Sequence, residues 1–212
     1  MLSAGMLSWT DAEFLYVEAV AHAENNVRTL HFCRQYHARR AMLAARLQFE
    51  IQLRENQRPF RKIDAVDQWL EQYTVLKDQY KFLVLDGKSG MGKTRFAANL
   101  ASAERFLCID CASATEPDLR SFDRDQHDVV LLDDARPEMI LRMKRLAQAS
   151  VDEVRLGQSA THVNSYAVWF HRVKLVVASN VWKSQLETCS PEDKAWLDMN
   201  SVYVFVDEPL HE

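Results

Sequence analysis

The chain of 212 residues is poor in glycine, with five against the roughly 7% of an average protein, and it has only five prolines. This scarcity excludes collagen-like and linker-like sequences, and an apolar fraction of 48% excludes a disordered chain. Three of the five glycines, Gly87, Gly90 and Gly92, fall within six consecutive positions. The residues that permit unusual backbone geometry are therefore concentrated near position 90.

Long apolar runs and cysteine frameworks are also missing. No run of about 18 apolar residues occurs, so we expect no membrane span, and the N-terminal residues do not resemble a secretory signal. The four cysteines indicate reduced thiols. Cys108 and Cys111 form a single C-x-x-C pair in an apolar run that predicts a buried strand, which argues against a zinc or redox site. We expect a soluble intracellular protein, and nothing in the sequence decides whether it enters the nucleus.

The charge is uneven along the chain. A net charge of −4 excludes a polycation that binds nucleic acid indiscriminately. Residues 28–62 nevertheless carry nine Lys or Arg and two acids, whereas residues 183–212 carry two Lys and seven acids. The basic segment is compatible with phosphate contacts or with a solvated helix face. Its stripe of Leu43, Leu47 and Ile51 at four-residue spacing favours packing.

Two regions of different character follow one another. Residues 1–62 predict a helical extension, a candidate oligomerisation region, and residues 63–212 predict the core domain. Helices are expected at 11–24, after a Thr10–Glu13 capping box, and at 28–56 and 63–77. After residue 80, short apolar runs at 82–85, 106–109, 129–132, 175–177 and 202–206 are separated by other segments, which include helices expected at 94–103 and 137–149. Strands that are apolar on both faces predict an α/β fold, a parallel sheet with helices on both faces.

The glycine cluster belongs to a phosphate-binding motif. Residues 87–94 match G-x-x-x-x-G-K-[ST] directly after an expected strand and before an expected helix. Glycines let inward-pointing amides wrap a phosphate, and the following helix adds its positive end. Lys93 would neutralise the β- and γ-phosphates of ATP, and the Thr94 hydroxyl would bind Mg²⁺. The residues assigned to the nucleotide are Gly87, Lys88, Ser89, Gly90, Met91, Gly92, Lys93 and Thr94.

Polar residues end two later strands. Asp133 and Asp134 follow an apolar strand, where Asp133 would hold the metal and Asp134 would polarise the attacking water. The apolar strand of residues 174–180 ends in Ser179 and Asn180, and the Asn180 amide can position that water without competing for the metal. The catalytic set is therefore Lys93, Asp134 and Asn180, and the metal ligands are Thr94 and Asp133.

The order of these motifs resembles the superfamily 3 helicase domain, a P-loop NTPase of the AAA+-like class. The greatest likeness is to the replication initiator (Rep) proteins of small circular single-stranded DNA viruses, over about residues 66–206. The resemblance implies an ATP-driven homo-oligomer, usually a hexameric ring, that unwinds DNA during replication by moving along single-stranded DNA. It also implies a DNA-contacting β-hairpin between the acid pair and the Asn strand. Its candidate DNA residues are Arg155, His162 and Asn164.

Two features depart from that family. Residues 1–80 contain no His-x-His metal motif, so we expect no DNA nicking. Ring ATPases send an arginine into the active site of a neighbouring subunit. No arginine follows Arg172 here, so the inserted arginine has no clear counterpart. The candidates for its role are Arg172 and, as poorer substitutes, Lys183 and Lys194. The sequence therefore supports ATP binding more directly than it supports DNA unwinding. Three alternatives stay open: another AAA+-like DNA-associated ATPase such as a loader, a small-molecule kinase using Arg136, Arg142 and Arg145, or a degenerate nucleotide-binding module.

Overall fold

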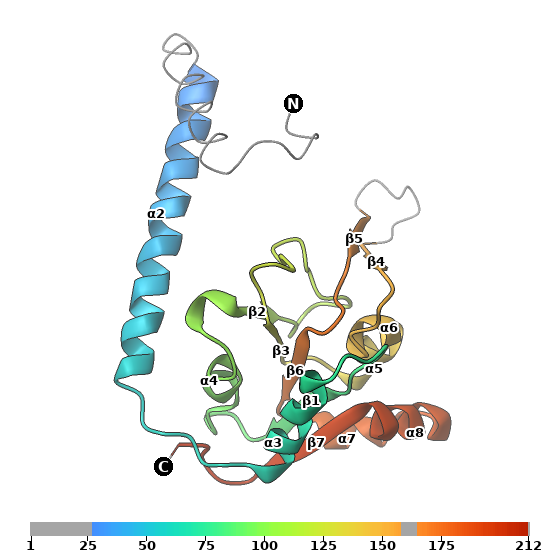
Figure 1. Cartoon of the computed structure of the whole chain (residues 1–212). Helices are drawn as coiled ribbons and strands as arrows, with labels where there is room; N and C mark the ends of the chain where they lie inside the picture. Colours follow the sequence, from blue (N-terminus) through green and yellow to red (C-terminus); the bar gives the residue numbers. More distant parts are fainter. Residues whose placement is uncertain (1–26, 158–164, 212) are drawn as a thin grey trace. The chain divides into compact units, whose positions relative to one another are not determined.

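The structure is a computed structural model that describes residues 27–157 and 165–211 (Figure 1). The chain divides into two compact units, residues 1–55 and 56–212. In the first unit, helix α2 spans Val27–Glu55. This range corresponds to the second expected helix, whereas the helix expected at 11–24 and its capping box lie outside the described residues.

The division falls before the expected boundary at residue 62. Phe60 forms an isolated antiparallel bridge with His211, and the Arg61 amide donates to the carbonyl oxygen of Leu210 at 2.9 Å. The segment before the first strand of the second unit is therefore paired with the end of the same unit.

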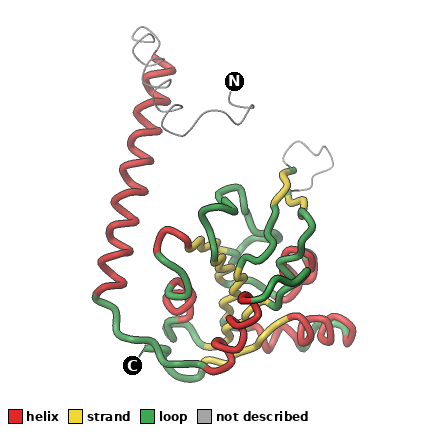
Figure 2. The backbone as a smooth tube through the Cα atoms, in the orientation of Figure 1, coloured by secondary structure: helices red, strands yellow, loops and turns green. Residues whose placement is uncertain are grey.

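The second unit contains a five-stranded parallel sheet, as the apolar runs predicted (Figure 2). Its strands are β1 (Phe82–Gly87), β2 (Phe106–Asp110), β3 (Val129–Asp133), β6 (Lys174–Ser179) and β7 (Ser201–Val206). They lie in the order β2-β3-β6-β1-β7, and every neighbouring pair is parallel. Because parallel strands end at the same edge of a sheet, the residues that follow β1, β3 and β6 are brought together.

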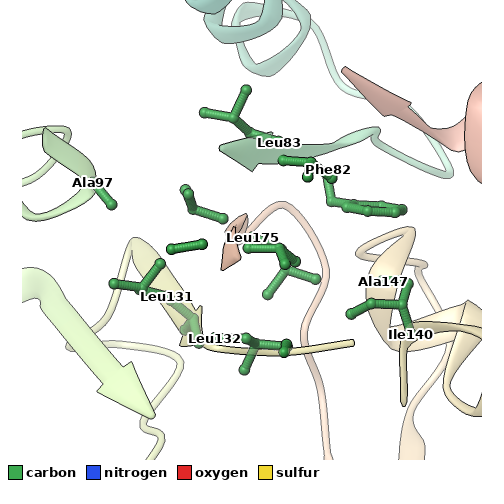
Figure 3. Close-up of a cluster of buried hydrophobic side chains, with 14 of the residues drawn as sticks. Phe82, Leu83, Ala97, Leu131, Leu132, Ile140, Ala147 and Leu175 are labelled. Carbon is green, nitrogen blue, oxygen red and sulfur yellow. The ribbon is translucent and has the colours of Figure 1, made fainter. Parts of the chain in front are cut away.

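The core lies around the three central strands. Every residue of β1 is buried, as are Val129–Leu132 of β3 and 175–179 of β6. Figure 3 shows side chains from helices on opposite sides of these strands, Ala97 on one and Ile140 and Ala147 on the other. The continuous apolar runs are thus explained by burial on both faces.

The edge strands are less buried than predicted. β2 lies at one edge of the sheet, and its residues are mostly half-buried or exposed. Cys108 in β2 is exposed, whereas Cys111, just after the strand, is buried. The expectation of a buried strand around the C-x-x-C pair is wrong because apolar composition alone does not distinguish a central strand from an edge strand. At the other edge, Tyr203 and Phe205 of β7 are exposed.

Several helices are shorter than their apolar patterns predicted. α3 spans Asp64–Glu71 and continues as the 3-10 turn η2 (Gln72–Thr74). The helix ends here because the side chains of Trp69 and Gln72 both donate to the Lys81 carbonyl oxygen and so turn the chain toward β1. α4 covers only Lys93–Ala98. The helix expected at 137–149 is divided at Met143 into α5 (Pro137–Arg142) and α6 (Lys144–Ala147). The remaining elements are η3 (Ala103–Arg105), α7 (Trp182–Leu186) and α8 (Pro191–Asn200).

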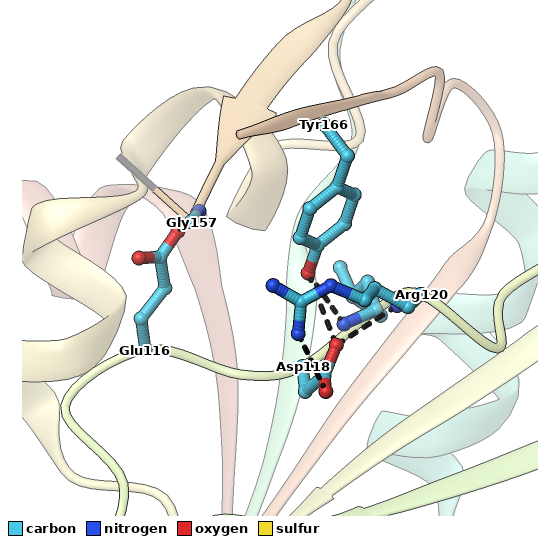
Figure 4. A network of polar contacts seen from close by, with 6 residues as sticks. Glu116, Asp118, Arg120, Gly157 and Tyr166 are labelled. Carbon is cyan, nitrogen blue, oxygen red and sulfur yellow. Dashed lines mark hydrogen bonds and ion pairs between the residues drawn. The ribbon is translucent and has the colours of Figure 1, made fainter. Parts of the chain in front are cut away.

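A two-stranded antiparallel hairpin lies between β3 and β6 in the sequence. It pairs β4 (Val154–Leu156) with β5 (Tyr166–Val168). Figure 4 shows how the segment 116–120 holds it: the Glu116 carboxylate accepts from the Gly157 amide at 3.0 Å, and the Tyr166 hydroxyl accepts from the Leu119 amide at 2.8 Å. Across the described part of the chain, no helix is long and apolar enough to cross a membrane.

Candidate nucleotide site

The segment between β1 and α4 contains the predicted phosphate-binding loop. β1 ends at Gly87 and α4 begins at Lys93, with Gly92 as its N-cap at a left-handed φ of 84°. A side chain at Gly87 would place its Cβ 2.1 Å from the carbonyl oxygen of Val206. Gly87 is therefore required by the close approach of β7, and Gly92 by the turn into the helix.

Lys93 lies at the centre of the site. Its ammonium group donates to the carbonyl oxygens of Gly87 and Lys88 at 2.7 and 2.8 Å and to Oδ1 of Asn180 at 2.8 Å. The residue is only 7% exposed. Burial lowers the pKa of Lys93, and the nearby carboxylates of Asp133, Asp134 and Asp86 oppose that shift. The three donors of the ammonium thus face oxygen acceptors that a phosphate can replace.

Thr94 and Asp133 meet next to Lys93. The Thr94 hydroxyl donates to the two carboxylate oxygens of Asp133 at 3.1 and 3.4 Å. Burial raises the pKa of Asp133, and the hydrogen bond from Thr94 acts in the opposite direction. Mg²⁺ is held in proteins by one or two carboxylates together with substrate phosphates. A hydroxyl and one carboxylate side by side fit such a partial ligand set.

Asn180 connects the two halves of the site. Its Nδ2 donates to Oδ1 of Asp134 at 3.1 Å, while its Oδ1 accepts from Lys93. This placement follows from topology, because β6 lies between β1 and β3, so the residue after β6 falls between the loop after β1 and the acids after β3. Asp134 itself has a left-handed φ of 56°.

These residues surround one cavity of about 320 Å³. Its lining includes every member of the predicted catalytic and metal sets, namely Lys93, Thr94, Asp133, Asp134 and Asn180, together with loop residues 89–92. Gly87 and Lys88 contribute carbonyl oxygens to Lys93. Arg95, which the sequence analysis did not consider, also lines the cavity.

Other predicted residues lie elsewhere. Arg155 is exposed on β4 in the hairpin, and His162 and Asn164 fall outside the described residues. Arg172 donates to the Tyr73 carbonyl oxygen at 2.8 and 3.3 Å. The Lys194 ammonium donates to the carbonyl oxygen of Glu187. Both side chains therefore contact their own chain.

Two supporting features were missed. Asp86 is a buried carboxylate directly before Gly87, and its signal in the sequence is a single acid in the apolar run that precedes the loop. The segment after β7 contacts the loop: the Leu210 amide donates to the Met91 carbonyl oxygen, and the His211 ring lies beside Gly92. No local pattern marks this second contact.

No protein-family model matches the chain, and no curated protein matches it in sequence. Among solved structures, it is similar to NtrX from Brucella abortus in complex with ADP, at 15% identity and a TM-score of 0.41, over 80% of this chain and 41% of that one. It is also similar to the S. cerevisiae Hsp104–ADP complex, at 14% identity and a TM-score of 0.41, over 68% of this chain and 32% of that one. The chain thus spans less than half of either protein. A likeness this distant carries no functional argument.

Proposed function

We propose that the protein is a P-loop NTPase of the AAA+-like class that binds ATP with Mg²⁺ and hydrolyses it. The observation that carries the proposal is the convergence of Lys93, Thr94, Asp133, Asp134 and Asn180 on one cavity beside a phosphate-binding loop. The five polar residues come from the ends of three neighbouring strands and the segments that follow them, and each suits one part of phosphoryl transfer.

The chemistry assigns a task to each side chain. The Lys93 ammonium leaves its carbonyl acceptors and neutralises the β- and γ-phosphate oxygens. Thr94 and Asp133 would hold Mg²⁺, and the bound metal would offset the negative charge of those oxygens. Asp134 and Asn180 orient a water molecule toward the γ-phosphorus, and Asp134 accepts its proton. The oxygen of that water forms a bond to phosphorus as the bond to the bridging β–γ oxygen breaks, giving ADP and phosphate.

A finer proposal is that this ATPase is a DNA helicase of superfamily 3 type. It is supported by the hairpin and by a groove of about 360 Å³ beside β5. In that groove the Arg120 guanidinium lies 5.0 Å from the ring of Tyr166, and the Arg124 guanidinium lies 5.6 Å from the ring of Trp169. Trp169 is 47% exposed. Exposed aromatic rings with adjacent guanidinium groups are the surfaces on which single-stranded bases stack.

Assembly into a homo-oligomer, such as a hexameric ring, completes the proposal. Arg95 is the one arginine among the residues that line the cavity, and it directly follows the proposed metal ligand Thr94. A neighbouring subunit would add a further positive charge opposite the γ-phosphate.

The test is the steady-state rate of ATP hydrolysis with and without single-stranded DNA, with the mass of the protein in solution measured in parallel. We expect DNA-stimulated hydrolysis that is lost in Lys93→Ala and kept in Lys81→Ala, a matched change at an exposed lysine outside both the site and the basic segment. Absence of hydrolysis under all conditions, or wild-type hydrolysis by Lys93→Ala, would reject the ATPase.

Adding a forked duplex, or a small acceptor molecule in place of DNA, to the hydrolysis assay separates the alternatives. A loader would hydrolyse ATP and bind DNA without separating the strands of a forked duplex. A small-molecule kinase would turn over an added acceptor in the absence of DNA. A degenerate module would bind nucleotide without steady hydrolysis.

A further inference from the structure

The buried carboxylate of Asp86 has three hydrogen-bond donors. Its Oδ1 accepts from the Trp182 amide at 3.1 Å. Its Oδ2 accepts from the Lys183 amide at 3.0 Å and from the Tyr203 hydroxyl at 2.9 Å. Asp86 is only 3% exposed, and a buried carboxylate is costly unless its oxygens are paired in this way. The mechanism derived above does not use this group.

The position of Asp86 links three strands at the edge where the site lies. In the register of the sheet, Asp86 of β1 is paired with Ser179 of β6 on one side and Phe205 of β7 on the other. The two amides that it accepts belong to the start of α7, just after Asn180. The carboxylate therefore fixes the turn between β6 and α7, and that turn carries the Asn180 side chain.

Tyr203 reaches this carboxylate from the edge of the sheet. The residue is 41% exposed, while its hydroxyl donates to Asp86. Burial and the hydrogen bond to Asp86 raise the pKa of Tyr203 to about 12, so at neutral pH the phenol keeps its proton and donates it. A change at this exposed residue can therefore alter the hydrogen bonding of the buried Asp86 carboxylate.

We propose that Asp86 and Tyr203 are positioning residues that hold Asn180 in register with Lys93 and Asp134, so that the edge strand β7 controls the rate of hydrolysis. The inference rests on the proposed ATPase function and assigns a control point to it. Because the Tyr203 hydroxyl touches neither the loop nor the metal ligands, its removal acts on the placement of the attacking water much more than on nucleotide binding.

Tyr203→Phe tests the proposal with little disturbance, since it removes one hydroxyl and keeps the ring. We expect kcat to fall about tenfold, the size of a hydrogen bond to a charged group, with nucleotide Kd changed by less than about twofold. Phe205→Leu is the matched control on the same exposed edge, and there kcat should stay at the wild-type value. A fall in affinity equal to the fall in kcat would overturn the proposal.

A double-mutant cycle gives the second test. If Tyr203 acts through Asn180, then Tyr203→Phe has no further effect on kcat in an Asn180→Ala background. A full tenfold loss in that background would show that the tyrosine acts by another route. Thermal unfolding of each variant shows whether the fold is retained.

Amide hydrogen exchange separates failure of this inference from failure of the ATPase proposal. Tyr203→Phe and Asp86→Asn should both speed exchange in residues 179–183, with or without hydrolysis by the wild type. If the wild type does not hydrolyse ATP but exchange responds, the ATPase proposal fails while the positioning contact stands. Unchanged exchange in both variants would refute the positioning role.

Discussion

The backbone amide of Leu210 donates a hydrogen bond of 3.0 Å to the carbonyl oxygen of Met91, so the segment after β7 is fastened to the phosphate-binding loop. The next residue, His211, makes further contacts. The His211 ring lies beside Gly92, and its centroid is 4.4 Å from that of the Phe60 ring. The conformation of the loop therefore depends on a segment far away in the sequence.

Leu210→Pro should weaken nucleotide binding more than Leu210→Ala does. Both changes remove the buried leucine side chain, but only proline removes the amide that donates to Met91. One hydrogen bond contributes about 1 kcal/mol, which corresponds to about a fivefold difference in Kd between the two variants. Titration with a fluorescent ATP analogue measures it, and equal affinities would show that the loop keeps its shape without this bond.

Gly87→Ala should destabilise the fold more than Gly90→Ala. The new methyl at position 87 would meet the Val206 carbonyl oxygen at 2.1 Å, which forces β7 away from β1 at a cost of about 3 kcal/mol. Position 90 has open space around it but a left-handed φ of 83°, which costs about 1 kcal/mol for alanine. Urea unfolding of both variants gives the order, and the reverse order would contradict this packing.

The gain in nucleotide affinity that Mg²⁺ provides should be lost, as the pH is lowered, at a higher pH than an ordinary aspartate would give. Burial raises the pKa of Asp133, so this carboxyl takes up a proton at a higher pH than an ordinary aspartate and then no longer binds a cation. The measurement is the gain in affinity for an ATP analogue on adding Mg²⁺, followed as the pH is lowered. Asp133→Asn is the control, because it should show little gain at any pH. A wild-type gain that persists down to the pKa of an ordinary aspartate would contradict the expected shift.

Trp169→Ala should weaken the binding of single-stranded DNA. Stacking of a base on an aromatic ring contributes about 1–3 kcal/mol, so the loss corresponds to roughly 5- to 150-fold in Kd. Met199→Ala removes an exposed apolar side chain that does not line this groove and should bind DNA as the wild type does. Fluorescence anisotropy with a labelled oligonucleotide at fixed salt compares them. Identical affinities would remove the groove from the DNA-binding surface.

The sequence alone predicted those parts of the site that are formed by residues close together in the sequence. The spacing of Gly87, Gly92 and Lys93 defines a loop whose shape is set by its own residues. An apolar run ending in Asp133 and Asp134 can be recognised without knowing which strand lies beside it. Asn180 was identified for the same reason. The central strands were predicted well because they are buried on both faces and so consist of continuous apolar runs.

The rest depends on contacts between distant segments. The role of Asp86 becomes visible only once β7 is known to lie beside β1, which brings Tyr203 to the carboxylate. The end of the helix expected at 63–77 was predicted too late in the chain because the side chains of Trp69 and Gln72 bond to Lys81 and terminate an otherwise favourable pattern. The exposure of Cys108 follows from strand order, which composition does not encode.

The pairing of β1 has a consequence for how the chain acquires its structure. Leu83 pairs with Val176 on one side and with Val202 on the other, and both partners are contributed late in the sequence. During synthesis the phosphate-binding loop therefore follows a strand that lacks both neighbours until most of the chain has emerged. Such long-range pairing slows folding and leaves an apolar strand edge exposed in the meantime. Nucleotide present at that stage has no formed site to bind, so it can stabilise the finished fold but cannot guide its first steps.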